Sequence, residues 1–200
     1  TSPKRLMMQD ARDEVLVLYR TFGLDKQESW KEGEDHIALE LEFGLARQDP
    51  DKAMSLLDGY ASSMHFSRDE KVAIAREIGL TLAKRFDPRA LEVMTKYDPE
   101  LRDNTVSEWR LRLLLRLARW EDAYQLTRKL PQDLATTNRW RYWQARSLEL
   151  AEPANPQALV LYKNLSRERD FYGFLAADRS KAPYQLVNKP LLMSQALINK

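Results

Sequence analysis

LAKRFDPRALEVM (residues 82–94) is the stretch that decides the fold, because three other segments of the chain follow its pattern. Each segment ends one predicted helix, turns through a short polar loop, and starts a second predicted helix with a small alanine. The other three segments are LARQDPDKAMSLL (45–57), LARWEDAYQL (117–126) and LAEPANPQALVLY (150–162). The pattern predicts a series of helical hairpins.

The alanines that start the second helices recur at a nearly constant spacing. They are Ala53, Ala90, Ala123 and Ala158, which are separated by 37, 33 and 35 residues. A period of about 35 residues in helical hairpins is typical of an α-solenoid, since one hairpin cannot bury its own apolar face. We therefore predict an all-α fold, an α-solenoid or superhelix of stacked helical hairpins, in which each alanine lets two helices approach closely.

The composition agrees with a folded helical protein. Of the 200 residues, 44% are hydrophobic, 31% are charged and six are glycine. No apolar run approaches the roughly 18 residues of a membrane span, and TSPKRLMMQD (1–10) lacks the apolar core of a signal peptide. The net charge of +2 argues against a dedicated nucleic-acid binder.

The charge is unevenly distributed along the chain. Residues 1–43 hold six basic and ten acidic side chains, a net charge of −4, so the remainder carries +6. We therefore expect an N-terminal helical segment over residues 1–43 and a helical-repeat domain over residues 44–200.

The segment NRWRYWQARSLEL (138–150) is the first candidate contact surface. Asn138 is a suitable N-cap, and Trp140 and Trp143 share one face because they lie three residues apart. A helix that is apolar on two faces is usually packed between repeats. We expect both tryptophans to have mainly structural roles, with an indole edge open to a ligand as the alternative.

Basic residues form the second candidate surface. RLRLLLRLAR (110–119) is expected to place Arg112, Arg116 and Arg119 along one helix face. This face is either solvated or a binding stripe for an anionic ligand. The chain has no cysteine, and its two histidines lack the spacing of metal ligands, so neither a metal site nor a cofactor is predicted.

Several blocks of the repeat region resemble the helical superhelix of soluble lytic murein transglycosylases. They are LARQDPDKAMSLL (45–57), EWRLRLLLRLARWEDA (108–123), KLPQD (129–133), WRYWQARSLEL (140–150) and ALVLYKNLSRERDFYGFLAADR (158–179). The resemblance covers roughly residues 45–200 and implies a periplasmic scaffold that positions peptidoglycan glycan strands for a catalytic domain. The tryptophans and arginines named above then become candidate contacts to glycan or peptide.

The catalytic signature of that family is not recognisable in this sequence. The family carries a Glu-Ser pair followed by a GLMQ-type segment. Here Glu28 and Ser29 form a Glu-Ser pair, but near the wrong end of the chain and without the companion motifs. We therefore expect a non-catalytic scaffold segment, with no catalytic residue assigned.

The N-terminal part resembles a different family. VLYRTFGLDKQESWKEGEDHIALELEF (17–43) is similar to molybdoenzyme maturation chaperones of the TorD/DmsD type, with Asp35 and His36 at the family's Asp-His position and Glu34 where the family has proline. This resemblance implies a cytoplasmic protein that binds twin-arginine leader peptides through the Asp35–His36 loop. A chance match, a fusion of two proteins, a sequence that joins two proteins, and a generic helical-repeat interaction module all stay open.

Overall fold

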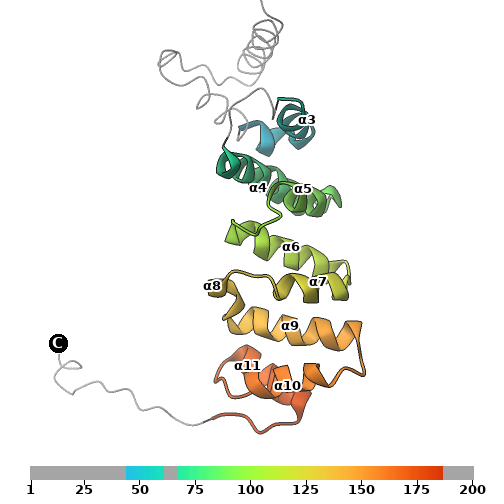
Figure 1. Cartoon of the computed structure of the whole chain (residues 1–200), viewed down its shortest axis with the longest axis vertical. Coiled ribbons are helices and arrows are strands. Elements are labelled where there is room, and N and C mark those ends of the chain that lie inside the picture. Colours follow the sequence, from blue (N-terminus) through green and yellow to red (C-terminus); the bar gives the residue numbers. More distant parts are fainter. Residues whose placement is uncertain (1–43, 61–66, 187–200) are drawn as a thin grey trace, which may run out of the picture. The chain divides into compact units, whose positions relative to one another are not determined.

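The computed structural model describes residues 44–60 and 67–186, and every regular element in this part of the chain is a helix. No strand occurs in these residues. The predicted all-α fold of helical hairpins is confirmed (Figure 1). The chain divides into two compact units, Thr1–Leu117 and Ala118–Lys200, which are described separately.

In the first unit, residues 44–48 are helical and four further helices follow them in the described residues. They are α3 (Pro50–Tyr60), α4 (Arg68–Lys84), α5 (Arg89–Tyr97) and α6 (Asn104–Arg116). Helix α4 is central, because it packs against α3, α5 and α6. The shared core is aliphatic and includes Leu45, Ala46, Leu57, Ile74, Ile78, Leu82, Met94 and Val106.

The second unit is built around one long helix. Its described helices are α7 (Trp120–Thr127), α8 (Gln132–Ala135), α9 (Asn138–Ala151), α10 (Pro156–Leu165) and α11 (Phe171–Ser180). Helix α9 contacts all four of the others, and α10 also packs against α11. The prediction that the aromatic helix lies between neighbouring elements is confirmed.

The four repeat alanines are buried near the starts of their helices. Ala53, Ala90 and Ala123 are fully buried, and Ala158 is 5% exposed. Each lies close to the start of its helix, on α3, α5, α7 and α10 respectively. A methyl side chain leaves the room that a neighbouring helix needs, so the spacing read from the sequence corresponds to a physical repeat.

Local capping signals explain where several helices begin. At α4, the Ser67 hydroxyl accepts a hydrogen bond from the Glu70 N–H, and the Glu70 carboxylate accepts one from the Ser67 N–H, which completes a capping box. At α10, Asn155 is the N-cap and Pro156 occupies the first turn. The N-cap expected for α9 is wrong by one residue, because Thr137 holds that position and Asn138 is already helical.

Ion pairs join residues that lie about one repeat apart. Arg89 on α5 pairs with Asp51 on α3, and Lys96 pairs with Asp58, each across 38 residues of sequence. In the second unit, Arg179 on α11 pairs with Glu149 on α9. Such exposed pairs contribute roughly 0–1 kcal/mol each, so they accompany the stacking of repeats and do not cause it.

Several turns use a left-handed residue other than glycine. In the described chain these residues are Phe86, Leu101, Ala118 and Lys181, with φ between 52° and 61°. After α4, the N–H of Phe86 donates to the carbonyl of Ala83, and the N–H of Asp87 donates to that of Leu82. This Schellman arrangement usually takes glycine, and an L-residue there costs about 1–2 kcal/mol.

Two helical glycines differ in what surrounds them. A Cβ at Gly173 on α11 would lie 2.1 Å from the backbone oxygen of Glu168. A Cβ at Gly79 on α4 would instead lie 2.7 Å from Cγ of Met94, a flexible side chain. Backbone can yield far less than a methionine, so Gly173 is the position that the fold requires to be glycine.

We predict that Gly173→Ala lowers the free energy of unfolding by about 3 kcal/mol or more, because the turn before α11 must be displaced. Gly79→Ala is the matched control. Its steric cost is partly offset by a gain of about 1 kcal/mol in helix propensity, so its loss should be clearly smaller. Thermal unfolding followed by circular dichroism measures both, and equal midpoints for the two variants would contradict the packing described for Gly173.

Candidate functional site

The two tryptophans of α9 lie in different environments. Trp140 is 2% exposed and belongs to the interior of the second unit. Trp143 is half-buried and packs against a small core formed by α9, α10 and α11. Trp143 therefore keeps surface that a ligand can reach, whereas Trp140 has almost none.

Trp143 is one end of an aromatic cluster that we call the α9–α11 cluster: Tyr142, Trp143, Tyr162, Phe171 and Tyr172. The Tyr142 ring is central, with its centroid 5.7 Å from that of Trp143 and 5.9 Å from those of Tyr162 and Tyr172. Phe171 meets Tyr172 edge to face at 5.2 Å and is 67% exposed. Ring pairs at these separations add packing energy beyond the buried area, so the cluster both holds the three helices together and reaches the surface.

A charged network borders this cluster at the C-terminal end of α9. The Glu149 carboxylate accepts hydrogen bonds of 2.7 Å from the Tyr162 hydroxyl and from Arg146. Arg179 on α11 approaches the other carboxylate oxygen at 3.3 Å. Burial opposes ionisation of Glu149, but these donors outweigh it and hold its pKa below the usual value. Burial and the Glu149 contact both raise the pKa of Tyr162, so its hydroxyl keeps its proton.

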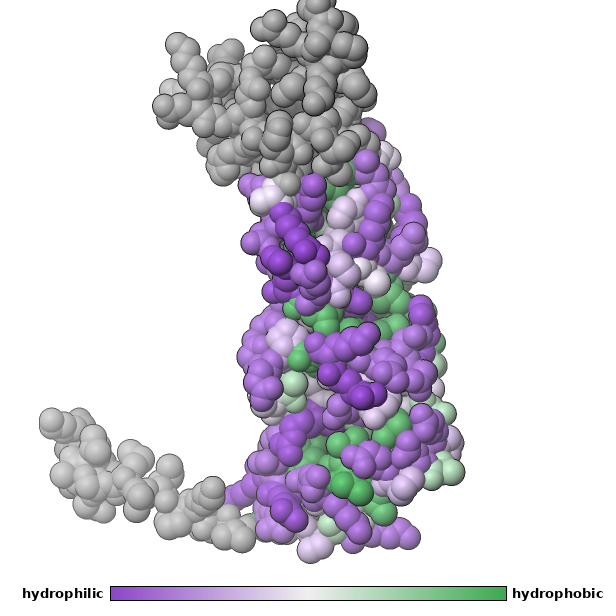
Figure 2. Space-filling model, in the orientation of Figure 1, coloured by the Kyte–Doolittle hydropathy of each residue, from purple (hydrophilic) through white to green (hydrophobic). Residues whose placement is uncertain are grey.

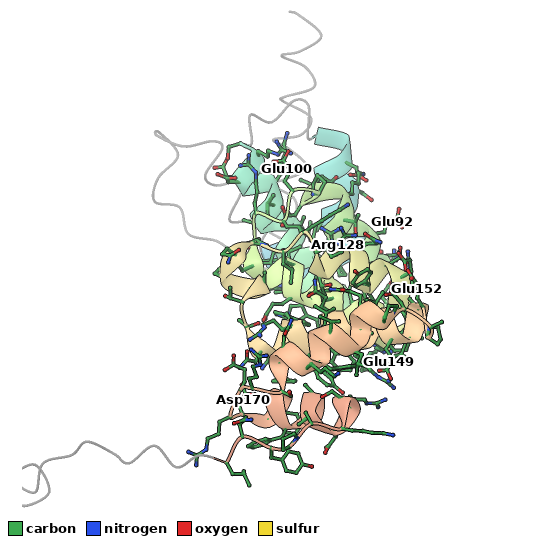
Figure 3. The ribbon with its side chains drawn as sticks, turned by 60° about the horizontal axis from the view of Figure 1, so that its bottom comes forward. Glu92, Glu100, Arg128, Glu149, Glu152 and Asp170 are labelled. Carbon is green, nitrogen blue, oxygen red and sulfur yellow. The ribbon has the colours of Figure 1, made fainter. Side chains whose placement is uncertain are left out.

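A second polar network lies at the other end of α9 (Figure 3). The Asn138 amide donates to Asp170, whose carboxylate also caps α11 through the N–H of Gly173. Arg141 donates a hydrogen bond to the side-chain oxygen of Asn138. It also forms an ion pair with Glu168, which lies in the turn before α11. These groups satisfy one another, so the network anchors the α10–α11 turn to α9.

The three arginines expected on one helix face do not share a helix. Helix α6 ends at Arg116, and Arg119 is the N-cap residue of α7, so the prediction for Arg119 is wrong. The physical reason is Ala118, whose φ of 54° lies outside the helical range and interrupts the helix between Arg116 and Arg119. Arg112 pairs with Glu108 and stacks on Trp109, while Arg119 pairs with Asp122.

Arg116 has a different partner, which the sequence did not reveal. Its guanidinium carbon lies 4.0 Å from the ring centroid of Phe86, a side chain that is 69% exposed. We refer to these two side chains as the Phe86–Arg116 pair. Phe86 lies in the turn between α4 and α5, where a polar residue or glycine is usual. Helical periodicity describes helix faces, so it could not identify Phe86 as a surface contact.

Charged residues cover much of the described surface on the face in Figure 2, with apolar patches between them. The large apolar side chains that are exposed are Phe86, Leu117, Leu159, Val160, Phe171, Tyr184 and Leu186. None of the helices in the described part of the chain combines the length and apolar character that a membrane crossing requires. Within those same residues, no group of three or more His, Cys, Asp or Glu side chains is placed to hold a metal ion. Asp35 and His36 lie outside the described residues.

Most of the chain is similar in structure to lytic transglycosylases. An inactive mutant of the lytic transglycosylase Slt from Pseudomonas aeruginosa superposes with a TM-score of 0.73 and 55% sequence identity, over 98% of this chain. The 70-kDa soluble lytic transglycosylase from Escherichia coli gives a TM-score of 0.67 at 21% identity, over 87% of this chain. This chain spans only about a third of either protein, 32% and 28% respectively.

A second similarity is confined to the N-terminal part. The family model described as nitrate reductase delta subunit matches residues 1–63. Both resemblances drawn from the sequence therefore gain support, and the two similarities overlap in the N-terminal part of the chain. Among curated proteins, none matches the chain.

We predict that Glu149→Gln weakens folding by about 1 kcal/mol near neutral pH, because a charge-assisted contact to Tyr162 and Arg146 is lost from a partly solvated site. Since the folded pKa of Glu149 is lowered, its stabilising contribution is complete above the ordinary value of 4.5 and disappears as the pH falls through the folded value. The difference between the variant and the wild type should therefore shrink in acid.

Urea unfolding at about pH 7 and about pH 3 measures this difference. Glu152→Gln is the matched control, because Glu152 follows α9 directly and its carboxylate accepts a hydrogen bond from Asn155 across a single turn. The control should have the same free energy of unfolding as the wild type at both pH values. A Glu149→Gln deficit that persists unchanged in acid would rule out the ionised carboxylate as its cause.

Proposed function

We propose that the helical repeats form a non-catalytic scaffold segment of a peptidoglycan lytic transglycosylase. The observation that carries this proposal is the 55% identity to the Pseudomonas enzyme over 98% of this chain, at a TM-score of 0.73. In this role the segment lies in the periplasm and guides glycan strands toward a catalytic domain. Helical repeats suit the task because stacked hairpins present a long, rigid surface.

The described carboxylates support a scaffold rather than an active site. A general acid for glycoside cleavage needs a carboxyl group whose pKa is raised, so that it holds a proton near neutral pH. Each described carboxylate with a resolved shift has a lowered pKa: Asp49, Asp58, Asp87, Glu100 and Glu149. Asp98 is 1% exposed, but its two oxygens accept hydrogen bonds from the N–H groups of Arg102 and Asp103.

The candidate contacts to glycan or stem peptide are Trp143, Arg112, Arg116 and Arg119. Trp143 offers an indole edge beside the α9–α11 cluster. The guanidinium group of an arginine can donate two parallel hydrogen bonds to a carboxylate of a peptide stem. Trp140 contributes through the core, where its truncation would cost about 3–5 kcal/mol, and is a poor candidate for direct contact.

The N-terminal part supports a second candidate function, the binding of a twin-arginine leader peptide by a chaperone-like segment. The observation that favours it is the match of residues 1–63 to the nitrate reductase delta subunit model. Under this proposal the segment 1–43 is a separate functional part, residues 44–200 form the repeat domain, and the binding takes place in the cytoplasm.

We predict that this chain sediments with purified peptidoglycan sacculi but releases no anhydro-muropeptides from them. Trp143→Ala should lower the bound fraction about threefold, whereas an exposed control such as Leu159→Ala should leave it unchanged. Co-sedimentation and chromatography of the supernatant measure both properties. Released anhydro-muropeptides would contradict the scaffold role, and a chain that stays in the supernatant would contradict glycan contact.

For the second candidate function, we predict that a labelled twin-arginine leader peptide binds the chain and that His36→Ala weakens binding at least about tenfold. The expected loss follows from the Asp35–His36 position in the resembled loop. His65→Ala is the control, since His65 is the other histidine of the chain. Fluorescence anisotropy gives the affinities, and equal affinities for the two variants would remove His36 from the proposed contact.

A further inference from the structure

Phe86 occupies a position that folding alone does not favour. Its backbone has a φ of 61°, a conformation that glycine adopts most easily. Its side chain is 69% exposed, so packing within the chain recovers little of the strain. A strained residue at an exposed turn is therefore a reason to look for contact with another molecule.

The ring is nevertheless held firmly in place. The backbone is fixed by the hydrogen bonds from Phe86 N–H to Ala83 and from Asp87 N–H to Leu82. Arg116 lies over the ring, with its guanidinium carbon 4.0 Å from the ring centroid. An aromatic ring fixed in this way loses little conformational entropy when a ligand binds.

The Phe86 ring has a cation against it and a second cation close by in sequence. Arg116 forms no ion pair with any carboxylate in residues 44–60 and 67–186, and Lys84 is exposed two residues before Phe86. The nearest carboxylate in sequence, Asp87, is held by Arg89, which lowers its pKa to about 2. The surface therefore combines an apolar ring with an available cation, and it complements a ligand that carries an apolar face and a negative charge.

We propose that the Phe86–Arg116 pair is a contact point for one muramoyl-peptide unit of peptidoglycan, which rests on the scaffold function proposed above. The C–H face of a pyranose ring is apolar and stacks on the face of the Phe86 ring opposite Arg116, which carries partial negative charge. The Arg116 guanidinium pairs with a carboxylate of the attached peptide stem. Both features belong to the same repeating unit of the polymer, so one ligand satisfies the ring and the cation together.

The test measures binding of a soluble disaccharide-peptide fragment of peptidoglycan to the full chain by isothermal titration calorimetry. Phe86→Gly removes the ring and places the preferred residue in the left-handed turn, so the variant should fold with a midpoint equal to or above that of the wild type. Arg116→Gln removes the charge. Each variant should weaken binding on the order of tenfold, and Leu159→Ala, which removes an exposed apolar side chain outside both candidate contacts, should not.

Weaker binding in Phe86→Gly without loss of thermal stability supports the proposal, because damage to the fold would lower both. Equal affinity in the wild type, Phe86→Gly and Arg116→Gln overturns it. The proposal is also overturned if the stem peptide alone, or an unrelated acidic peptide, binds as tightly as the whole fragment. Co-sedimentation with intact sacculi distinguishes failure of the Phe86–Arg116 contact from failure of the scaffold function. The scaffold function survives if the wild type still sediments, and fails if it does not.

Discussion

A helical hairpin in this chain has an apolar face that only a neighbouring hairpin can cover. Helix α4 shows the constraint in the first unit, where it buries residues against α3, α5 and α6 at once. Helix α9 does the same in the second unit. Stability in such a stack comes from contacts between neighbours, and the small side chains of Ala53, Ala90, Ala123 and Ala158 allow those contacts to be close.

The same constraint explains which features could be predicted from the sequence. Alanine spacing and capping residues are local signals that repeat, so the hairpins and the Ser67–Glu70 capping box followed directly. The helix break at Ala118 has no such signal, because alanine rarely adopts a positive φ and ordinarily extends a helix. For that reason the sequence pattern predicts that Arg119 continues the helix of Arg112 and Arg116, whereas that helix ends at Arg116.

The candidate site was less predictable than the fold. Trp140 and Trp143 are three residues apart and share a helix face by periodicity, yet only Trp143 keeps accessible surface. The difference depends on which neighbouring helix covers each position, and that is a tertiary property. Phe86 was missed for a related reason, because its partner Arg116 lies 30 residues further along the chain, on another helix.

The two similarities of the chain overlap in its N-terminal part, because one covers 98% of the chain and the other covers residues 1–63. The nitrate reductase delta subunit model matches as far as residue 63, which includes α3. Leu45, Ala53 and Leu57 nevertheless share one apolar core with α4 and α5. A boundary placed at residue 63 would cut through that core and expose apolar surface on both sides.

The four described residues with a left-handed backbone differ in how their surroundings offset the backbone strain. Leu101 adopts a φ of 58° but is 5% exposed, so burial compensates for its backbone. Ala118 carries only a methyl group, and Lys181 keeps a flexible charged side chain in water. Phe86 alone among the four described residues combines a bulky ring, a left-handed backbone and high exposure. Its cation–π contact with Arg116 contributes about 0.5–1 kcal/mol at an exposed site, less than a left-handed backbone costs. Burial of the exposed ring by a ligand would add favourable energy that offsets the remaining backbone cost.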